Sequence, residues 1–131
     1  MPTTEVKVAA GVIERDGQVL VTQRAATAHQ GGLWEFPGGK LESGESAEQA
    51  LVRELAEELN IQVTQQSPLI EIAHDYGDKQ VRLFVSVVHD FEGEPQGMEG
   101  QPMQWVAAAD LNTLSFPAAN LPIIQAYLDQ I

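Results

Sequence analysis

The sequence predicts an α/β (α+β) fold, in which a mixed β-sheet is flanked by helices. Two valine-rich runs separated by Asp-Gly indicate paired strands near the N-terminus, and two later segments repeat apolar residues at helical spacing. With 131 residues and 44% hydrophobic content, the chain is long enough to bury a core. We therefore expect a single domain spanning residues 1–131.

The first predicted strands are Val6 to Glu14 and Gln18 to Gln23, with Asp16-Gly17 between them. Asp-Gly between two apolar runs is a strong signal for a β-hairpin. Leu33 to Phe36 is predicted as a short strand that Pro37-Gly38-Gly39 stops. The N-terminal third should therefore contribute three strands.

A helix is predicted to begin after Ser46, because Ser46 and Gln49 have the spacing of a capping box. Asn60 stands where the helix should end, and asparagine tolerates the left-handed conformation found there. The apolar face that we expect to be buried consists of Ala47, Ala50, Leu51, Leu55 and Leu59.

Further strands are predicted at 69–74, 81–88 and about 103–106, and a last helix at 121–130. The last helix should pack through Leu121, Ile124, Tyr127 and Leu128.

The composition excludes several classes of protein. The net charge of −12, from 19 acidic and 7 basic residues, argues against direct binding of nucleic acid through a basic face. The absence of cysteine excludes disulfides and thiolate metal sites. Neither a long apolar run nor a secretory signal is apparent, so no membrane partner and a cytoplasmic location are expected.

Four carboxylates, Glu45, Glu54, Glu57 and Glu58, lie with Arg53 on and just before the first helix. The last three share one helix face, where like charges repel each other. A hard divalent cation that prefers oxygen ligands would relieve this repulsion. The alternative is a solvated acidic face with Arg53 as a partial counter-ion.

The glycines before the helix favour the metal site over that alternative. Gly38-Gly39 and Gly44 allow the backbone to turn sharply and to approach a ligand closely. A glycine carbonyl could then serve as a further oxygen ligand. Magnesium usually takes few protein ligands and completes its shell with water and substrate phosphates.

The segment from Gly39 to Ile61 matches the pattern G-x5-E-x7-R-E-U-x-E-E-x-G-U, with U aliphatic, at every position except Asn60. By this motif the chain resembles the Nudix hydrolases. The resemblance implies a Nudix-type α/β/α sandwich and hydrolysis of a phosphoanhydride bond with Mg²⁺, for which Mn²⁺ could substitute. It also implies Glu58 and the Gly38 carbonyl as principal metal ligands, with Glu54 and Glu57 adjoining.

The same resemblance implies the catalytic group. Glu54 is the first choice for the general base that accepts a proton from water, and Glu99 the second, unless Glu99 is only a surface glutamate. Arg53 would orient the acidic cluster through salt bridges, with Glu45 as its partner.

Beyond this motif, the chain is similar to family members that remove oxidised guanine nucleotides such as 8-oxo-dGTP. They release the nucleoside monophosphate and pyrophosphate. The segments that carry the similarity are 23–26, 28–29, 35–40, 92–95, 99–102 and 116–120. The substrate-binding residues implied are Arg24, His29, Glu35, Phe36, Pro37, Gly38, Lys79 and Asn120.

Asn120 would hydrogen-bond the purine edge, Phe36 would line the base pocket, and Arg24 and His29 would contact the sugar or phosphates. Lys79 is near a position where these relatives have an arginine, whose planar guanidinium lysine cannot reproduce. Each has a structural alternative. Asn120 could cap the last helix, Phe36 could be a core residue, Arg24 could simply end a strand, and His29 could be solvated.

Three other functions stay open. The segments 13–17 and 33–36 also resemble relatives that prefer pyrimidine nucleoside triphosphates such as CTP. A regulatory module without turnover would usually lack the carboxylates that are present here. An acidic calcium-binding protein is the third alternative, but the acidic segment does not have the residue spacing of an EF-hand. In each enzymatic case we expect a monomer acting on a small nucleotide.

Overall fold

The computed structural model describes residues 4–23, 32–75, 77 and 79–131. In order along the chain, the elements are β1 (Thr4–Arg15), β2 (Gln18–Gln23), β3 (Trp34–Glu35), β4 (Gly38–Lys40), α1 (Ala47–Leu59), β5 (Gln62–Asp75), β6 (Lys79–Glu92), β7 (Met103–Ala107), the short 3₁₀ helices η1 (Ala108–Thr113) and η2 (Ala118–Asn120), and α2 (Leu121–Gln130).

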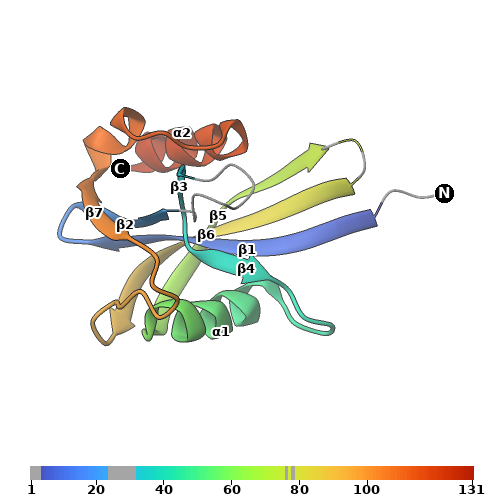
Figure 1. Ribbon diagram of the computed structural model, residues 1–131, viewed down its shortest axis with the longest axis horizontal. Coiled ribbons are helices and arrows are strands. Elements are labelled where there is room, and N and C mark those ends of the chain that lie inside the picture. The colour runs from blue at the N-terminus through green and yellow to red at the C-terminus, as the bar shows by residue number, and fades with distance from the viewer. Residues whose placement is uncertain (1–3, 24–31, 76, 78) are drawn as a thin grey trace.

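The strands form one mixed sheet with the order β3-β2-β1-β6-β5, to which β4 adds by pairing with β1 and β7 by pairing with β2. β1 and β6 run parallel, and the other pairs are antiparallel. Figure 1 shows α1 below the sheet and α2 above it. The predicted mixed sheet flanked by helices is therefore confirmed.

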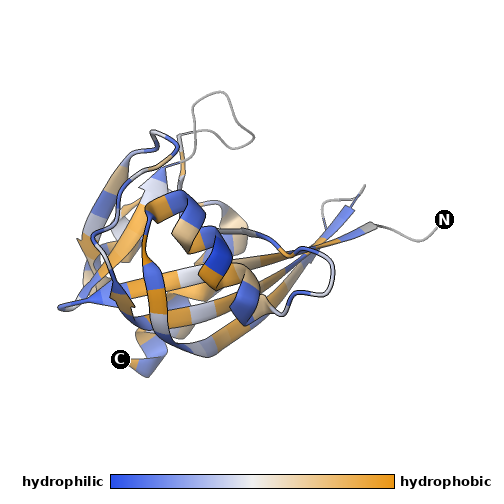
Figure 2. Ribbon diagram, turned by 90° about the horizontal axis from the view of Figure 1, so that it is seen from below, coloured by the Kyte–Doolittle hydropathy of each residue, from blue (hydrophilic) through white to orange (hydrophobic). Residues whose placement is uncertain are grey.

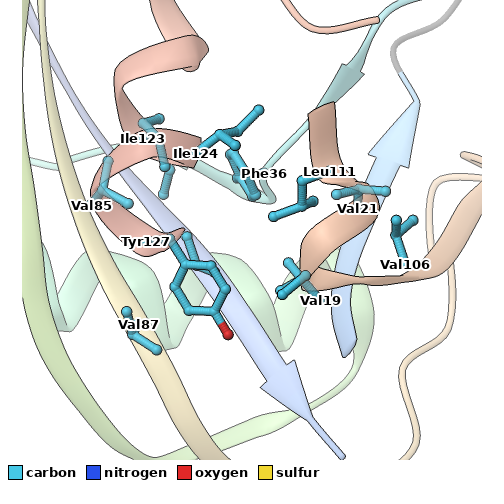
Figure 3. Packing of buried hydrophobic residues seen from close by; sticks show 13 residues of the cluster. Val19, Val21, Phe36, Val85, Val87, Val106, Leu111, Ile123, Ile124 and Tyr127 are labelled. Carbon is cyan, nitrogen blue, oxygen red and sulfur yellow. The ribbon is translucent and has the colours of Figure 1, made fainter. Parts of the chain in front are cut away.

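The sheet has a hydrophobic cluster on each face. Even-numbered residues of β1, such as Ala10 and Val12, belong to the cluster beneath α2, whereas Ala9 and Ile13 belong to the cluster beneath α1. In Figure 3 the side chains of α2 and of the central strands meet in the first cluster. Figure 2 shows hydrophobic residues along the strands, and each face of the sheet has its own hydrophobic cluster beneath a helix.

The three predicted local signals have the expected geometry. Asp16 and Gly17 both have positive φ, 54° and 79°, as a tight hairpin turn requires, and β1 pairs with β2 through them. Ser46 and Gln49 exchange the two hydrogen bonds of a capping box. Asn60 ends α1 in the left-handed conformation, with φ 57° and ψ 38°.

The main departures from the predicted elements lie in β4, in β5 and β6, and in α2. Gly38–Lys40 forms β4 against β1, whereas this glycine segment was predicted only to stop a strand. β5 and β6 each contain 14 residues and extend beyond the predicted ranges, because backbone pairing continues through polar residues. In α2, Leu121 is 53% exposed, and Ile123 is buried in its place.

A chain of hydrogen bonds ties α2 to three strands. The Tyr127 hydroxyl donates to Glu14 at 2.6 Å, Glu14 contacts the His89 ring at 2.7 Å, and the other ring nitrogen contacts the Ser67 hydroxyl at 2.7 Å. The burial of Tyr127 and its bond to Glu14 both raise its pKa. The polar end of a buried aromatic side chain is thereby satisfied.

Tyr127→Phe should therefore lower the free energy of unfolding by about 1–2 kcal/mol, because it deletes a bond to a charged acceptor while keeping the ring. Urea unfolding followed by circular dichroism measures this. An unchanged midpoint would show that the bond adds nothing to stability.

Candidate active site

Arg53 is the centre of the acidic segment. Its Nε and Nη2 donate to the two carboxylate oxygens of Glu45 at 2.7 and 2.9 Å, and its Nη1 donates to Glu54 at 2.8 Å. Nη2 also donates to the Lys40 carbonyl at 3.0 Å. These bonds raise the pKa of Arg53. They also lower the pKa of Glu45 to about 2, together with a bond from the Glu42 amide.

Gly38 lies where strand β4 meets β1, and only glycine fits there. A Cβ would overlap the carbonyl oxygen of Ala9. The neighbouring Pro37 carbonyl accepts from the Gly11 amide at 2.8 Å, so in the alternating antiparallel ladder the amide and carbonyl of Gly38 point away from β1. The Gly38 amide bonds Glu58 instead, which places the backbone of β4 beside the acidic helix.

Gly39 makes room for the Glu54 carboxylate. A Cβ at Gly39 would overlap the carboxylate carbon and crowd both of its oxygens. The Glu54 side chain is only 16% exposed and is held on its other side by Arg53. The sequence predicted that Gly38 and Gly39 allow a close approach to the backbone. In the structure the strand β1 approaches Gly38, and the Glu54 carboxylate approaches Gly39.

Glu58 has the most perturbed carboxylate of the cluster. Burial raises its pKa to about 8, and the negative charges of Glu54, Glu99 and Glu35 add to the effect, while the bond from Gly38 opposes it. The protein alone therefore does little to balance the negative charge of ionised Glu58. A cation between these carboxylates would supply the missing charge.

This donor set fits a divalent metal that takes some of its ligands from the protein and the others from water and the substrate. In the part of the chain that the structure describes, no three acidic or histidine side chains already converge as a complete metal cage. Glu57 is 62% exposed and lies 3.5 Å from Arg53. Oxygen donors that fill only part of the shell are usual for Mg²⁺, which keeps waters and binds substrate phosphates.

Glu58 and Glu99 line one cavity of about 360 Å³, together with Glu35 and residues of β2 and of the loop before β7. Glu99 itself is exposed, in the loop between β6 and β7. The structure thus brings both candidate bases, Glu54 and Glu99, close enough to Glu58 for their charges to act on it.

A second cavity, of about 310 Å³, lies under the N-terminal end of α2. Phe36 lines it, is 5% exposed and stacks on Phe116 with ring centroids 5.2 Å apart. Asn120 also lines it, and its side chain makes no capping hydrogen bond to α2. The other lining residues are Val8, Ala9, Ala10, Glu35, Gly38, Gly39, Lys40, Ile72, His74, Val81, Leu83 and Ala119.

The remaining predicted substrate residues are placed less directly. Arg24 and His29 lie outside the described residues. Lys79 begins β6 and is exposed, and it is not among the described residues that line the cavity. Pro37 is buried and contributes its carbonyl to the sheet, not to the cavity wall.

Sequence analysis did not identify the wall that β5 and β6 give to this second cavity, formed by Ile72, His74, Val81 and Leu83. The period-2 alternation of a strand explains why these residues share one face, but it gives no sign that the face borders a cavity. His74, which has the same strand parity as the apolar Ile70 and Ile72, was the available signal.

A family model described as NUDIX domain matches residues 8–126. The chain belongs to the Nudix hydrolase family, whose members generally need a divalent metal.

The chain is 41% identical over 121 residues to 8-oxo-dGTP diphosphatase of Escherichia coli K12, covering 92% of this chain and 94% of that protein. It is 38% identical over 123 residues to CTP pyrophosphohydrolase of the same organism, covering 94% and 91%. A solved structure from work on MutT of Aliivibrio salmonicida and Vibrio cholerae has a TM-score of 0.87 and 38% identity, covering 98% of this chain and 100% of that one.

Neither α-helix in the described part of the chain has the length and hydrophobicity needed to cross a bilayer.

Proposed function

We propose that this enzyme is a Mg²⁺-dependent nucleoside triphosphate pyrophosphohydrolase that hydrolyses 8-oxo-dGTP, and dGTP, to the monophosphate and pyrophosphate. In this role it would remove mutagenic oxidised guanine from the nucleotide pool. We propose a monomeric cytoplasmic enzyme that acts on the free nucleotide, without a nucleic-acid or membrane partner. Mn²⁺ would substitute for Mg²⁺.

The observation that carries the proposal is the shared wall between the two cavities. Glu35 lines both the cavity of Glu58 and Glu99 and the cavity of Phe36 and Asn120. A nucleotide has the same two-part character, with a flat base at one end and a polyanionic triphosphate at the other. The cavity of Phe36 and Asn120, which combines an aromatic wall with polar groups, suits the base, and a metal among the carboxylates suits the phosphates.

Glu58 and the Gly38 carbonyl would hold the metal, with Glu54 and Glu57 adjoining. When bound, the metal neutralises phosphoryl oxygens and lowers the pKa of water. The Gly38 amide orients Glu58, since it donates to that carboxylate while the carbonyl of the same residue points to the same side of β4. This placement of the two donors supports the assignment.

Glu54 is proposed as the general base, which would accept the proton of the attacking water. Arg53 fixes one Glu54 oxygen, and Gly39 lets the carboxylate lie against the backbone. Glu45 in turn holds Arg53 through two bonds. Arg53 and Glu45 are thus positioning residues, and Glu99 is the second candidate for the base.

The base would lie against Phe36, with Asn120 at its polar edge. An asparagine amide offers both a donor and an acceptor, which matches a purine edge that carries a 6-oxo group and an N7–H. Because Asn120 makes no capping bond, helix capping does not account for this side chain.

A cytosine nucleotide is the second candidate substrate, favoured by the similarity to the CTP pyrophosphohydrolase. Measurement of kcat/KM for 8-oxo-dGTP, dGTP, CTP and 5-methyl-dCTP with saturating Mg²⁺ separates the two. The proposal expects the highest value for 8-oxo-dGTP. A higher value for either cytosine nucleotide would replace it with the second candidate.

Asn120→Ala should lower kcat/KM for 8-oxo-dGTP by about 10–100-fold, the usual cost of removing a polar partner from a base edge, and should lower it less for CTP. Asn112→Ala, in η1, is a control for a surface asparagine. An equal loss with every nucleotide would assign Asn120 a structural role.

Hydrolysis in ¹⁸O-labelled water locates the bond that is cleaved. The resemblance to MutT supports attack at the β phosphorus, for which label should appear in pyrophosphate. Label found only in the monophosphate would indicate attack at the α phosphorus.

A further inference from the structure

The loop that carries Glu99 is fastened to the C-terminal end of α1. The backbone amides of Gln96 and Met98 donate to the carbonyl oxygens of Leu59 and Glu58, at 2.9 and 3.0 Å. The last carbonyls of a helix lack partners within the helix, so the loop supplies them. The helix of the acidic cluster thereby also anchors the loop.

Gln101 adds a side-chain link between the loop and this helix. Its Oε1 accepts from the Glu99 amide at 2.9 Å, and its Nε2 donates to the Glu58 carbonyl oxygen at 3.3 Å. One primary amide therefore connects the backbones of the two acidic residues. The turn is tight around Gln101, because a Cβ at Gly97 would lie 2.6 Å from the Gln101 carbonyl oxygen.

The link matters because Glu99 is exposed, in a loop, and yet acts on the half-buried Glu58. Glu99 and Glu58 line the same cavity, and the charge of Glu99 is felt at Glu58. A long flexible carboxylate side chain keeps such a position only when its backbone is fixed. The Gln101 side-chain amide fixes the backbone at Glu99 itself.

We propose that Gln101 is a positioning residue that holds the Glu99 carboxylate over the Glu58 end of the acidic cluster. This inference rests on the proposed function, because it gives Glu99 a part in that reaction. Gln101 need not touch the nucleotide. Its loss should therefore change kcat and metal binding more than KM for the nucleotide.

Gln101→Met is the direct test, since methionine has a similar length but neither donates nor accepts as an amide does. We expect kcat for 8-oxo-dGTP to fall by about 10-fold, as is typical when a residue that orients a metal-site group is lost. KM should stay within about twofold, and calorimetry should show weaker binding of Mn²⁺ to the free protein.

A double-mutant cycle with Glu99→Gln separates positioning from general structure. In the Glu99→Gln background, Gln101→Met should change kcat by less than about twofold, because no carboxylate is left to position. Gln96→Met is the matched control in the same loop, because Gln96 contacts α1 through its backbone amide. It should retain the wild-type kcat.

Two results would overturn the inference: a wild-type kcat for Gln101→Met, or an equal fractional loss with and without Glu99. If Glu58→Gln is inactive and Gln101→Met is fully active, only the positioning role of Gln101 is refuted and the proposed function stands. If Glu58→Gln keeps full Mg²⁺-dependent turnover, the proposed function fails as well. Thermal midpoints of all variants identify any loss that comes from unfolding.

Discussion

Glu54→Gln is expected to lower kcat by about 10²–10⁴-fold, the contribution of a positioned general base. The fold should be kept, because glutamine has nearly the same shape and its amide oxygen can still accept the bond from Arg53. KM for 8-oxo-dGTP should change much less than kcat. Steady-state pyrophosphate release with saturating Mg²⁺ measures both quantities.

Glu48→Gln is the matched control for this substitution. Glu48 lies on the same helix, in its first turn, and is exposed. The control should have wild-type kinetics. Near wild-type turnover of Glu54→Gln would remove Glu54 as the base, and a large loss in Glu99→Gln alone would move the role to Glu99.

Glu58→Gln is expected to have opposite effects on the metal-free and the metal-bound protein. The folded-state pKa of Glu58, about 8, lies above the ordinary value of 4.5, so the folded chain disfavours the ionised form. Below the ordinary value the group is protonated in both states, and the substitution should change stability little. As the pH rises to about 8 the penalty becomes complete, and a neutral glutamine should relieve it.

In chelator at pH 9, Glu58→Gln should therefore be more stable than wild type. The gain should be on the order of 2 kcal/mol, because solvent screening of this partly exposed carboxylate reduces the full effect of the pKa shift, and it should be smaller at pH 6. With Mg²⁺ the order should reverse, because wild type gains binding energy that the variant has lost. Differential scanning calorimetry at both pH values measures this.

The control for Glu58→Gln is Glu57→Gln. Because the Glu57 side chain is 62% exposed, this substitution should change the stability in chelator and the stabilisation by Mg²⁺ less. A Glu58→Gln variant that is stabilised by Mg²⁺ as strongly as wild type would exclude Glu58 as a principal ligand.

The local parts of the structure were predictable from the sequence because each depends on few neighbouring residues. Asp16-Gly17 specifies its turn by tolerating positive φ, and Ser46 with Gln49 satisfies the first amides of α1. The spacing of Arg53, Glu54 and Glu58 likewise placed them on one helix. Such features do not depend on how the rest of the chain folds.

The parts that could not be predicted depend on contacts between distant segments. β4 exists because the Gly38 backbone lies against β1, which no local pattern records. Glu57 belongs to the same motif as Glu54 and Glu58, yet its side chain lies in solvent beside Arg53. The anchoring of Glu99 by Gln101 requires the loop before β7 to meet the end of α1.

The base cavity shows the same limit. Asn120 and Phe36 were identified through the resemblance, but their partners on β5 and β6 came only from the folded sheet. Leu121 was expected in the core because of its helical spacing, whereas the first turn of α2 directs Ile123 there.

The most direct test of the account is the release of pyrophosphate from 8-oxo-dGTP by the wild-type protein, with Mg²⁺ and with chelator. The account predicts 8-oxo-dGMP and pyrophosphate in equal amounts with Mg²⁺, and loss of the activity in chelator and in Glu58→Gln. Absence of pyrophosphate release with Mg²⁺, or release that continues undiminished in chelator, would contradict it.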